Sequence, residues 1–205
     1  MNNSAGDINQ KGLIKNWFRM GFTPYLCLCE LIANMIDAIA HNIKIIVDDR
    51  YVYLVDDGCG MNRLKINNMF SAYRENHDND NSIGISGIGG KISSLILSEG
   101  PSSKGNIKYS NVDIFTYDDG GEPLYVCIPW NTITTEWKYN NMINYRTMNN
   151  SEFSLFKSHV NNTGTIIRFK KTRKLFKNKI ILYILRILTI VFELVIFRID
   201  KSLEF

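Results

Sequence analysis

The sequence predicts an α+β protein, a two-layer sandwich with a mostly antiparallel, mixed sheet and helices packed on one face. Segments with helical spacing of apolar residues alternate along the chain with short runs of β-branched and aromatic residues. That interleaving is typical of two packed layers. The 205 residues, 45% hydrophobic and 21% charged, are enough to bury a core without disulfides.

The first half of the chain contains the clearest helix start. Thr23 caps the amide groups of a first turn, and Pro24 fits the first helical position. Apolar side chains then follow three or four residues apart. In this half we expect a weak helix at Ile8–Met20, helices at Tyr25–His41, Arg63–Tyr73 and Ile88–Leu97, and a hairpin of strands at Ile43–Val47 and Tyr51–Val55.

The second half is dominated by strand-like runs rich in Val, Ile, Thr and aromatic residues. Four of these runs are bounded by polar or turn-forming residues, which is typical of the short strands of an antiparallel sheet. We expect strands near Val112–Tyr117, Leu124–Ile128, Ile133–Lys138 and Thr165–Phe169.

The apolar segment Ile180–Ile199 has the length of a membrane span. It also contains Arg186 and Glu193, each of which costs about 2.5–3.5 kcal/mol near a bilayer centre. With Lys179 and Asp200, these charges recur every seven residues and form one thin polar stripe on a helix. We therefore expect packing against a sheet or a partner, not a membrane span. Whether the segment is one helix or a helix followed by a strand stays open.

Two further features exclude classes of function. The cysteines Cys27, Cys29, Cys59 and Cys127 have neither a C-x-x-C pair nor zinc-site spacing, so we expect small buried thiols. The first eleven residues lack the apolar stretch of a signal peptide, which predicts an intracellular protein, cytoplasmic or nuclear.

The first pattern that indicates chemistry lies in the strong predicted helix. Glu30, Asn34 and Asp37 are four and three residues apart, so they share one helical face. Polar groups buried there without partners would cost a few kcal/mol each. They form either a binding face or the solvated stripe of an amphipathic helix.

The second pattern is Asp56-x-Gly58-x-Gly60-Met61 at the end of a predicted strand. Glycines at alternate positions permit close approach of a ligand to the backbone. A carboxylate beside such a turn can accept a hydrogen bond from an exocyclic amine. Taken alone, the pattern also fits a plain Asp-Gly turn.

The third pattern is the glycine-rich loop Gly84-Ile85-Ser86-Gly87-Ile88-Gly89-Gly90-Lys91, which leads into a predicted helix. Amide groups at a helix N-terminus, together with a lysine, form a cradle for phosphate. A Walker A loop is excluded because Ile85 stands five residues before Gly90 and Ile92 follows Lys91. The dinucleotide fingerprint is excluded because it needs a small residue where Ile92 stands.

The order of these patterns resembles the Bergerat ATP-binding fold of the GHKL superfamily, which includes gyrase B, heat-shock chaperone ATPases, histidine kinases, MutL and MORC proteins. The likeness runs from about Tyr25 to Ser98, with a fourth box at Thr163–Ile167. The segments ELIANMIDA, DDGCGM and IGISGIGGK are most similar to the MORC and MutL versions. Ala33 departs from the pattern, because many members carry Asp there.

The resemblance implies roles for the helix residues. Glu30 would be the catalytic general base that activates the attacking water. Asn34 would be the metal ligand, giving its side-chain oxygen to Mg²⁺, and Asp37 would support the helix and nearby waters.

The resemblance also implies a site for the cofactor ATP. The stretch Arg74–Ser82 would belong to a mobile lid over it. Asp56 would bind the adenine amine, and Thr165 would join its water network. The remaining implied contacts are Gly58, Gly60 and Met61 around the base, Gly84, Gly87, Gly89 and Gly90 in the phosphate loop, and Lys91 at the terminal phosphates.

The function implied is Mg²⁺-dependent ATP hydrolysis that gates a conformational change or a homodimer, with weak turnover in isolation. Histidine kinases usually have Asn where Glu30 stands, so Glu30 favours hydrolysis over kinase activity. A nucleotide-binding interaction module with little turnover, or a degenerate fold that has lost nucleotide binding, remain alternatives.

The net charge of +4 is unevenly placed. Between Phe153 and Phe192 there is no Asp or Glu but nine Lys or Arg, seven of them between Arg168 and Lys179. This basic run is either a solvated linker or a contact for the DNA backbone. We expect an N-terminal extension at 1–22, the ATP-binding domain at 23–170, and a basic and apolar segment at 171–205 that packs on the domain or on a partner.

Overall fold

The computed structural model describes residues 9–70, 88–100, 107–139 and 141–171. Several features expected from the sequence lie outside these residues. They are Gly84, Gly87, the stretch Arg74–Ser82 and the apolar segment Ile180–Ile199.

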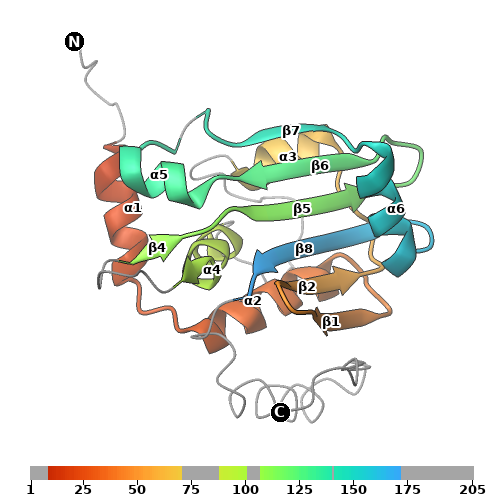
Figure 1. The fold of residues 1–205 in the computed structure, drawn as a ribbon, viewed down its shortest axis with the longest axis horizontal. Helices are drawn as coiled ribbons and strands as arrows, with labels where there is room; N and C mark the ends of the chain where they lie inside the picture. Colours follow the sequence, from red (N-terminus) through yellow and green to blue (C-terminus); the bar gives the residue numbers. More distant parts are fainter. Residues whose placement is uncertain (1–8, 71–87, 101–106, 140, 172–205) are drawn as a thin grey trace.

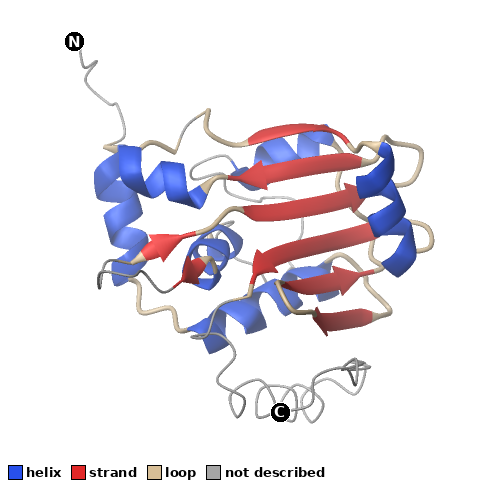
Figure 2. Cartoon of the chain, viewed as in Figure 1, coloured by secondary structure: helices blue, strands red, loops and turns tan. Residues whose placement is uncertain are grey.

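A six-stranded sheet forms the centre of the molecule (Figures 1 and 2). Its order is β1-β2-β8-β5-β6-β7, and each neighbouring pair is antiparallel. The last strand is therefore inserted between β2 and β5. The strands are β1 (Ile43–Val47), β2 (Tyr51–Asp56), β5 (Val112–Tyr117), β6 (Leu124–Ile128), β7 (Asn144–Thr147) and β8 (Gly164–Lys170), and β3 (Glu99–Gly100) pairs separately with β4 (Lys108–Tyr109).

Five helices share one hydrophobic core with the first face of the sheet. They are α1 (Gln10–Arg19), α2 (Pro24–Asp37), α3 (Arg63–Phe70), α4 (Gly89–Leu97) and α5 (Trp130–Glu136). Alternate strand residues point into this core because successive side chains of a strand face opposite ways. Each large apolar side chain buried there contributes about 1.5–3 kcal/mol. Val52, Leu54, Ile114 and Ile167 of the strands meet Leu28, Leu31 and Ile32 of α2 and Ile92 and Leu95 of α4.

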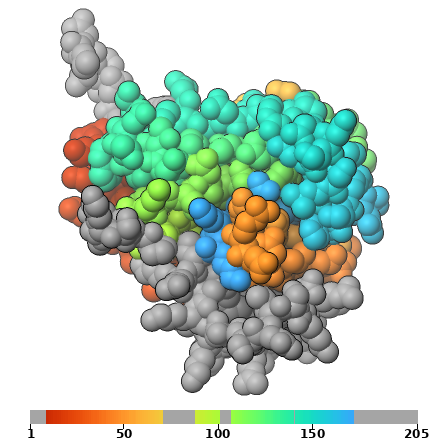
Figure 3. Space-filling view, viewed as in Figure 1, coloured from red at the N-terminus to blue at the C-terminus, as the bar shows by residue number. Residues whose placement is uncertain are grey.

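On the second face, the described residues place helix α6 (Asn150–His159) over one end of the sheet. Figure 1 shows α6 in front of the strands, and Figure 3 shows its cyan atoms covering that part of the face. Phe156 of α6 packs with Tyr53, Phe115 and Ile166 of the strands. The two-layer α+β class is thus confirmed, with this helix as an addition that the sequence patterns did not predict.

The strand predicted at Ile133–Lys138 is wrong, because these residues lie mostly in helix α5. Its β-branched residues favour strands. Here the hydroxyls of Thr134 and Thr135 donate to the carbonyls of Trp130 and Asn131, each at 2.7 Å, which suits a helix. Burial of Trp130 and Ile133 then fixes the helix against the core.

Helix α1 is part of the same core. Leu13, Ile14 and Trp17 of α1 are buried, and the Gln10 side chain accepts a hydrogen bond from the Tyr139 amide at 2.6 Å. Across the part of the chain that the structure describes, none of the helices is both long and apolar enough to cross a bilayer.

Candidate nucleotide site

Helix α2 presents the first group of predicted residues. It begins at the expected Thr23-Pro24 pair, where the Thr23 hydroxyl accepts a hydrogen bond from the Leu26 amide at 3.3 Å. Its apolar side faces the core, which leaves Glu30 half-buried and Asn34 and Asp37 exposed. The helix start therefore determines which polar side chains lie outside the core.

Helix α4 packs beside α2, and its first glycines lie against these side chains. A Cβ added to Gly89 would overlap the carboxylate of Glu30, and one added to Gly90 would lie 3.4 Å from Asn34 Nδ2. The structure thus brings together two motifs that are far apart in the sequence. Glycine is needed at position 89 because the Glu30 carboxylate occupies the space of a side chain.

Glu30 has the electrostatic character of a base. Burial is the main cause that raises the pKa of its carboxyl, and the nearby charge of Asp37 raises it further. A carboxylate whose pKa is raised toward neutral pH accepts a proton more readily.

Lys91, which we expect at the terminal phosphates, is buried within helix α4. Its side chain is only 2% exposed, and burial lowers the pKa of its ammonium to about 8. A phosphate contact by Lys91 requires this side chain to emerge from the protein, so that role stays a prediction.

Asp56 and Thr165, the residues expected near the adenine base, belong to a row of three polar residues across neighbouring strands. Asp56 of β2 lies opposite Thr165 of β8, and Thr165 lies opposite Thr116 of β5. All three are buried, at 3%, 7% and 0% exposure. Burial raises the pKa of Asp56 to about 7, although backbone hydrogen bonds from Gly58 and Thr165 lower it.

The turn that follows β2 is fixed by its own residues. The Asp57 carboxylate accepts hydrogen bonds from the amides of His41 and Asn42, at 2.8 and 2.7 Å, and from the Asn42 side chain. Burial alone would raise the pKa of Asp57, but these bonds lower it. The turn is therefore tied to the end of α2.

Two glycines let this turn lie close to neighbouring backbone. A Cβ on Gly58 would lie 2.6 Å from the Ala38 carbonyl oxygen. Gly60 has φ +63, and a Cβ there would overlap the Tyr117 carbonyl at the end of β5. The next residue, Met61, donates its amide hydrogen to the Thr116 hydroxyl at 2.8 Å.

Motif analysis of the sequence missed Thr116 and Asp57. Thr116 is one polar residue in an apolar strand, so only the strand pairing reveals that it faces Thr165. Asp57 precedes Gly58, and its contact with Asn42 depends on the meeting of α2 and the turn.

Residues 23–102 match the family model of histidine kinase-, DNA gyrase B- and HSP90-like ATPases. The match to this ATPase family covers α2, the turn after β2 and α4, and it ends before β8. It supports an ATP-binding domain of the GHKL type, and the six-stranded sheet with its helices is consistent with the Bergerat fold. Among curated proteins, none matches the chain.

The Asn34 amide is compatible with Mg²⁺ as the cation of a nucleotide site. Within residues 9–70, 88–100, 107–139 and 141–171, no group of three or more His, Cys, Asp or Glu side chains is placed to hold a metal ion. Mg²⁺ in nucleotide sites needs only one or two protein oxygens, since phosphates and waters supply the rest. The exposed Asn34 amide beside Gly90 can provide one.

Proposed function

We propose that this chain binds ATP with Mg²⁺ and hydrolyses it, and that ATP gates a conformational change or a homodimer, as in the MORC and MutL branches of the GHKL superfamily. The observation that carries the proposal is the contact of Glu30 and Asn34 with the glycines that begin α4. One small region thus combines a carboxylate of raised pKa, an amide ligand and helix N-terminal amides.

At the base end, we assign the exocyclic amine of adenine to Asp56. Its carboxylate is buried beside the glycine turn, and it can accept a hydrogen bond once ionised. Thr165 lies next to it on the same face, and Gly60 and Met61 form the adjoining backbone.

At the phosphate end, we assign the phosphates to the first turn of α4. Ile88 precedes this helix and has no side-chain acceptor with which to cap its amides. Those amides and the positive end of the helix dipole attract an anion. Asn34 would hold Mg²⁺, which when bound neutralises charge on the phosphates.

For hydrolysis, we assign proton removal from the attacking water to Glu30. Glutamate can take up this proton, whereas the asparagine usual in histidine kinases cannot. This difference favours hydrolysis over phosphate transfer to a protein.

The test is Glu30→Gln, which keeps the shape of the side chain and removes the base. We expect phosphate release to fall to background while ATP binding, measured by calorimetry with Mg²⁺, is retained. Glu136→Gln on the exposed surface of α5 is the matched control and should change neither measurement. Unchanged turnover in Glu30→Gln would overturn the assignment.

The burial of Lys91 favours a second candidate, nucleotide binding with little turnover. Lys91 is 2% exposed, so without a rearrangement it would add little charge stabilisation in the transition state. Size-exclusion chromatography with a non-hydrolysable ATP analogue separates the candidates. A dimer that forms with the analogue, combined with negligible phosphate release, would favour the gated module.

We also propose DNA as a partner of the basic run from Arg168 to Lys179. Arg168 pairs with Asp113 at 2.7 Å, so it is not free for phosphate. Among the residues of this run that the structure describes, Lys170 and Lys171 are the candidate contacts for DNA phosphates. Binding to duplex of arbitrary sequence should fall steeply with salt. The proposal fails if the protein does not bind duplex at low salt.

A further inference from the structure

We propose that Thr116 is a positioning residue that sets the hydrogen-bonding polarity of the base site, so that the site accepts a 6-aminopurine and rejects a 6-oxopurine. This inference rests on the proposed nucleotide binding, and it assigns a role to a residue outside the recognised motifs. Thr116 would act through Thr165 and Met61.

The position of Thr116 follows from the register of three strands. It lies opposite Thr165, which in turn lies opposite Asp56. Directly opposed residues of antiparallel strands have Cβ atoms about 4.5–5.5 Å apart. The other residues on this face of β5, Val112 and Ile114, belong to the apolar core. A fully buried hydroxyl at Thr116 is therefore an exception that needs partners.

The contacts of Thr116 account for all of its hydrogen-bonding capacity. A threonine hydroxyl has one proton to donate and two lone pairs to accept with. One lone pair accepts the Met61 amide at 2.8 Å. The Thr116 hydroxyl donates its proton to the Gly164 carbonyl at 3.1 Å.

The remaining contact joins the hydroxyl oxygens of Thr116 and Thr165 at 3.2 Å. Either oxygen could be the donor in this contact, and because the Thr116 proton is used at Gly164 we assign Thr165 as the donor. The Thr165 proton is then directed toward Thr116 and away from the base. Thr165 consequently offers only its lone pairs to a ligand.

In this arrangement the base site offers hydrogen-bond acceptors to a ligand. Ionised Asp56 and the Thr165 oxygen are both acceptors, and they are neighbours on one face. An exocyclic amine carries two protons and can satisfy acceptors there, whereas a carbonyl in its place would leave them without a donor. Thr116 thereby disfavours a 6-oxopurine as well as favouring a 6-aminopurine.

Thr116 also holds the turn that borders the base. Gly58 donates its amide to Asp56 at 2.9 Å, and Met61 donates its amide to Thr116. The turn is thus attached at both ends of the polar row. Loss of the Thr116 hydroxyl would release the Met61 end, which is the end beside Gly60.

The experiment compares binding of ADP and IDP, which differ in the amine or carbonyl at position 6. We expect Thr116→Val, which has nearly the same shape, to weaken ADP binding about tenfold and to reduce the ADP preference over IDP by a similar factor. Thr116→Ser restores the hydroxyl and should return both values to within about twofold of wild type. Thr134→Val removes a helix hydroxyl from α5 and should leave both unchanged.

The outcomes separate this inference from the proposed function. If wild type binds neither nucleotide, the proposed function fails and the base selection fails with it. If wild type binds ADP and Thr116→Val keeps the same affinity and preference, only the role of Thr116 is overturned.

A second measurement covers the case in which Thr116→Val does not fold. Amide hydrogen exchange at Met61 in the wild-type protein reports the bond to Thr116 directly, because Met61 lies outside every described helix and strand. Slow exchange supports the attachment of Met61 to Thr116, the contact that the inference requires. Exchange as fast as in an exposed turn would overturn it.

Discussion

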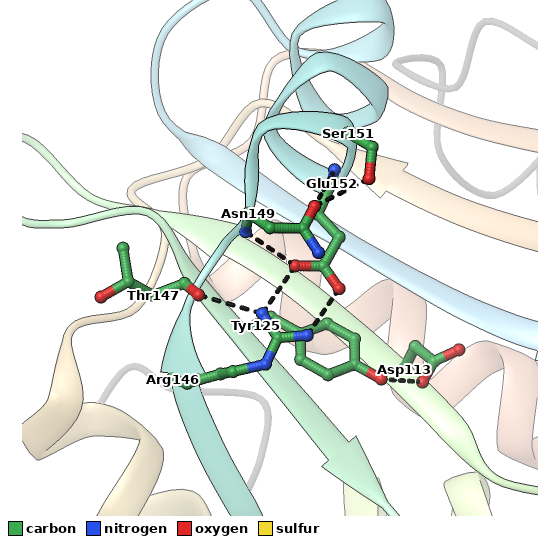
Figure 4. Close-up of polar contacts among 7 residues, drawn as sticks. All are labelled: Asp113, Tyr125, Arg146, Thr147, Asn149, Ser151 and Glu152. Atoms are coloured by element: carbon green, nitrogen blue, oxygen red, sulfur yellow. Dashed lines mark hydrogen bonds and ion pairs between the residues drawn. The ribbon is translucent and has the colours of Figure 1, made fainter.

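Acidic side chains on the two faces of the sheet have opposite surroundings. On the second face, Glu152 forms two hydrogen bonds of 2.7 Å with Arg146, and Arg146 lies over the Tyr125 ring (Figure 4). Tyr125 donates its hydroxyl to Asp113 at 2.7 Å. The hydrogen bond from Arg146 is the main cause that lowers the pKa of Glu152.

On the first face, burial raises the pKa values of Asp56 and of Glu30 in α2, and no cation among the described residues contributes to either shift. The backbone hydrogen bonds to Asp56 from Gly58 and Thr165 lower its pKa only in part. Perturbed acids of this kind are typical of functional sites, whereas paired acids are typical of structural surfaces. The contrast indicates that the second face maintains the fold and that the first is prepared for a cationic or hydrogen-donating ligand.

The largest effect should come from Gly89→Ala, because the added Cβ overlaps the Glu30 carboxylate. Overpacking costs about 1–3 kcal/mol, so we expect α2 and α4 to separate and ATP affinity to fall up to about a hundredfold. Calorimetry with Mg²⁺ and ATP measures this. Gly12→Ala in α1 is the control, because its Cβ would lie 3.4 Å from the nearest atom. Equal ATP affinity in the two variants would contradict the close packing.

The second prediction concerns how the stability of wild type and of Asp56→Asn depends on pH. Because the pKa of Asp56 is raised from 3.8 to about 7, the folded protein binds its proton more tightly than the unfolded chain. The stability that this proton contributes is complete below pH 3.8 and is lost as the pH rises through about 7. We therefore expect the melting temperature of wild type to fall relative to Asp56→Asn between pH 5 and pH 8.

The ionisation of Asp56 also affects the affinity for ADP. Here the ionised form is the favourable one. The amine requires ionised Asp56, so wild type should bind ADP about tenfold more tightly than Asp56→Asn at pH 8. That advantage should shrink by about tenfold per unit below pH 7, as the ionised fraction falls. A pH-independent difference between the two proteins would show that Asp56 does not titrate in this range.

The features that the sequence predicted correctly are local ones, each determined by a few neighbouring residues. The Thr23-Pro24 start of α2 and the bounds of β1, β5 and β6 were predicted correctly, because capping, helical spacing and β-branched runs act over a few residues. Helix α6 was missed, although Asn149 and Glu152 form a capping box that is a sequence signal for a helix start. The error at α5 arose because β propensity depends on context.

The arrangement of the site depended on contacts that no local pattern contains. The glycines of α4 and the face of α2 were singled out, but their contact follows from helix packing. The row of Asp56, Thr165 and Thr116 requires β8 to lie between β2 and β5, and the chain order does not reveal this insertion. The burial of Lys91 is likewise a result of packing in α4.

We expect the smallest effect on ADP affinity from a substitution that breaks an ion pair on the second face. Arg168→Met removes the guanidinium that donates two hydrogen bonds to Asp113 and stacks on Tyr51. Because Asp113 is half-buried and keeps the Tyr125 hydroxyl, we expect a loss of about 1–3 kcal/mol in the free energy of unfolding. ADP affinity should stay within about twofold, since no side chain of the base site is altered.

Arg146→Met is the matched control for this variant, because the Arg146 side chain is 51% exposed against 23% for Arg168. An exposed ion pair contributes about 0.2–1 kcal/mol, so its loss should destabilise the protein less. Urea unfolding of both variants, together with calorimetry for ADP, measures the two quantities separately. If either variant weakened ADP binding without lowering stability, the second face would take part in the site, and the division between the two faces would have to be abandoned.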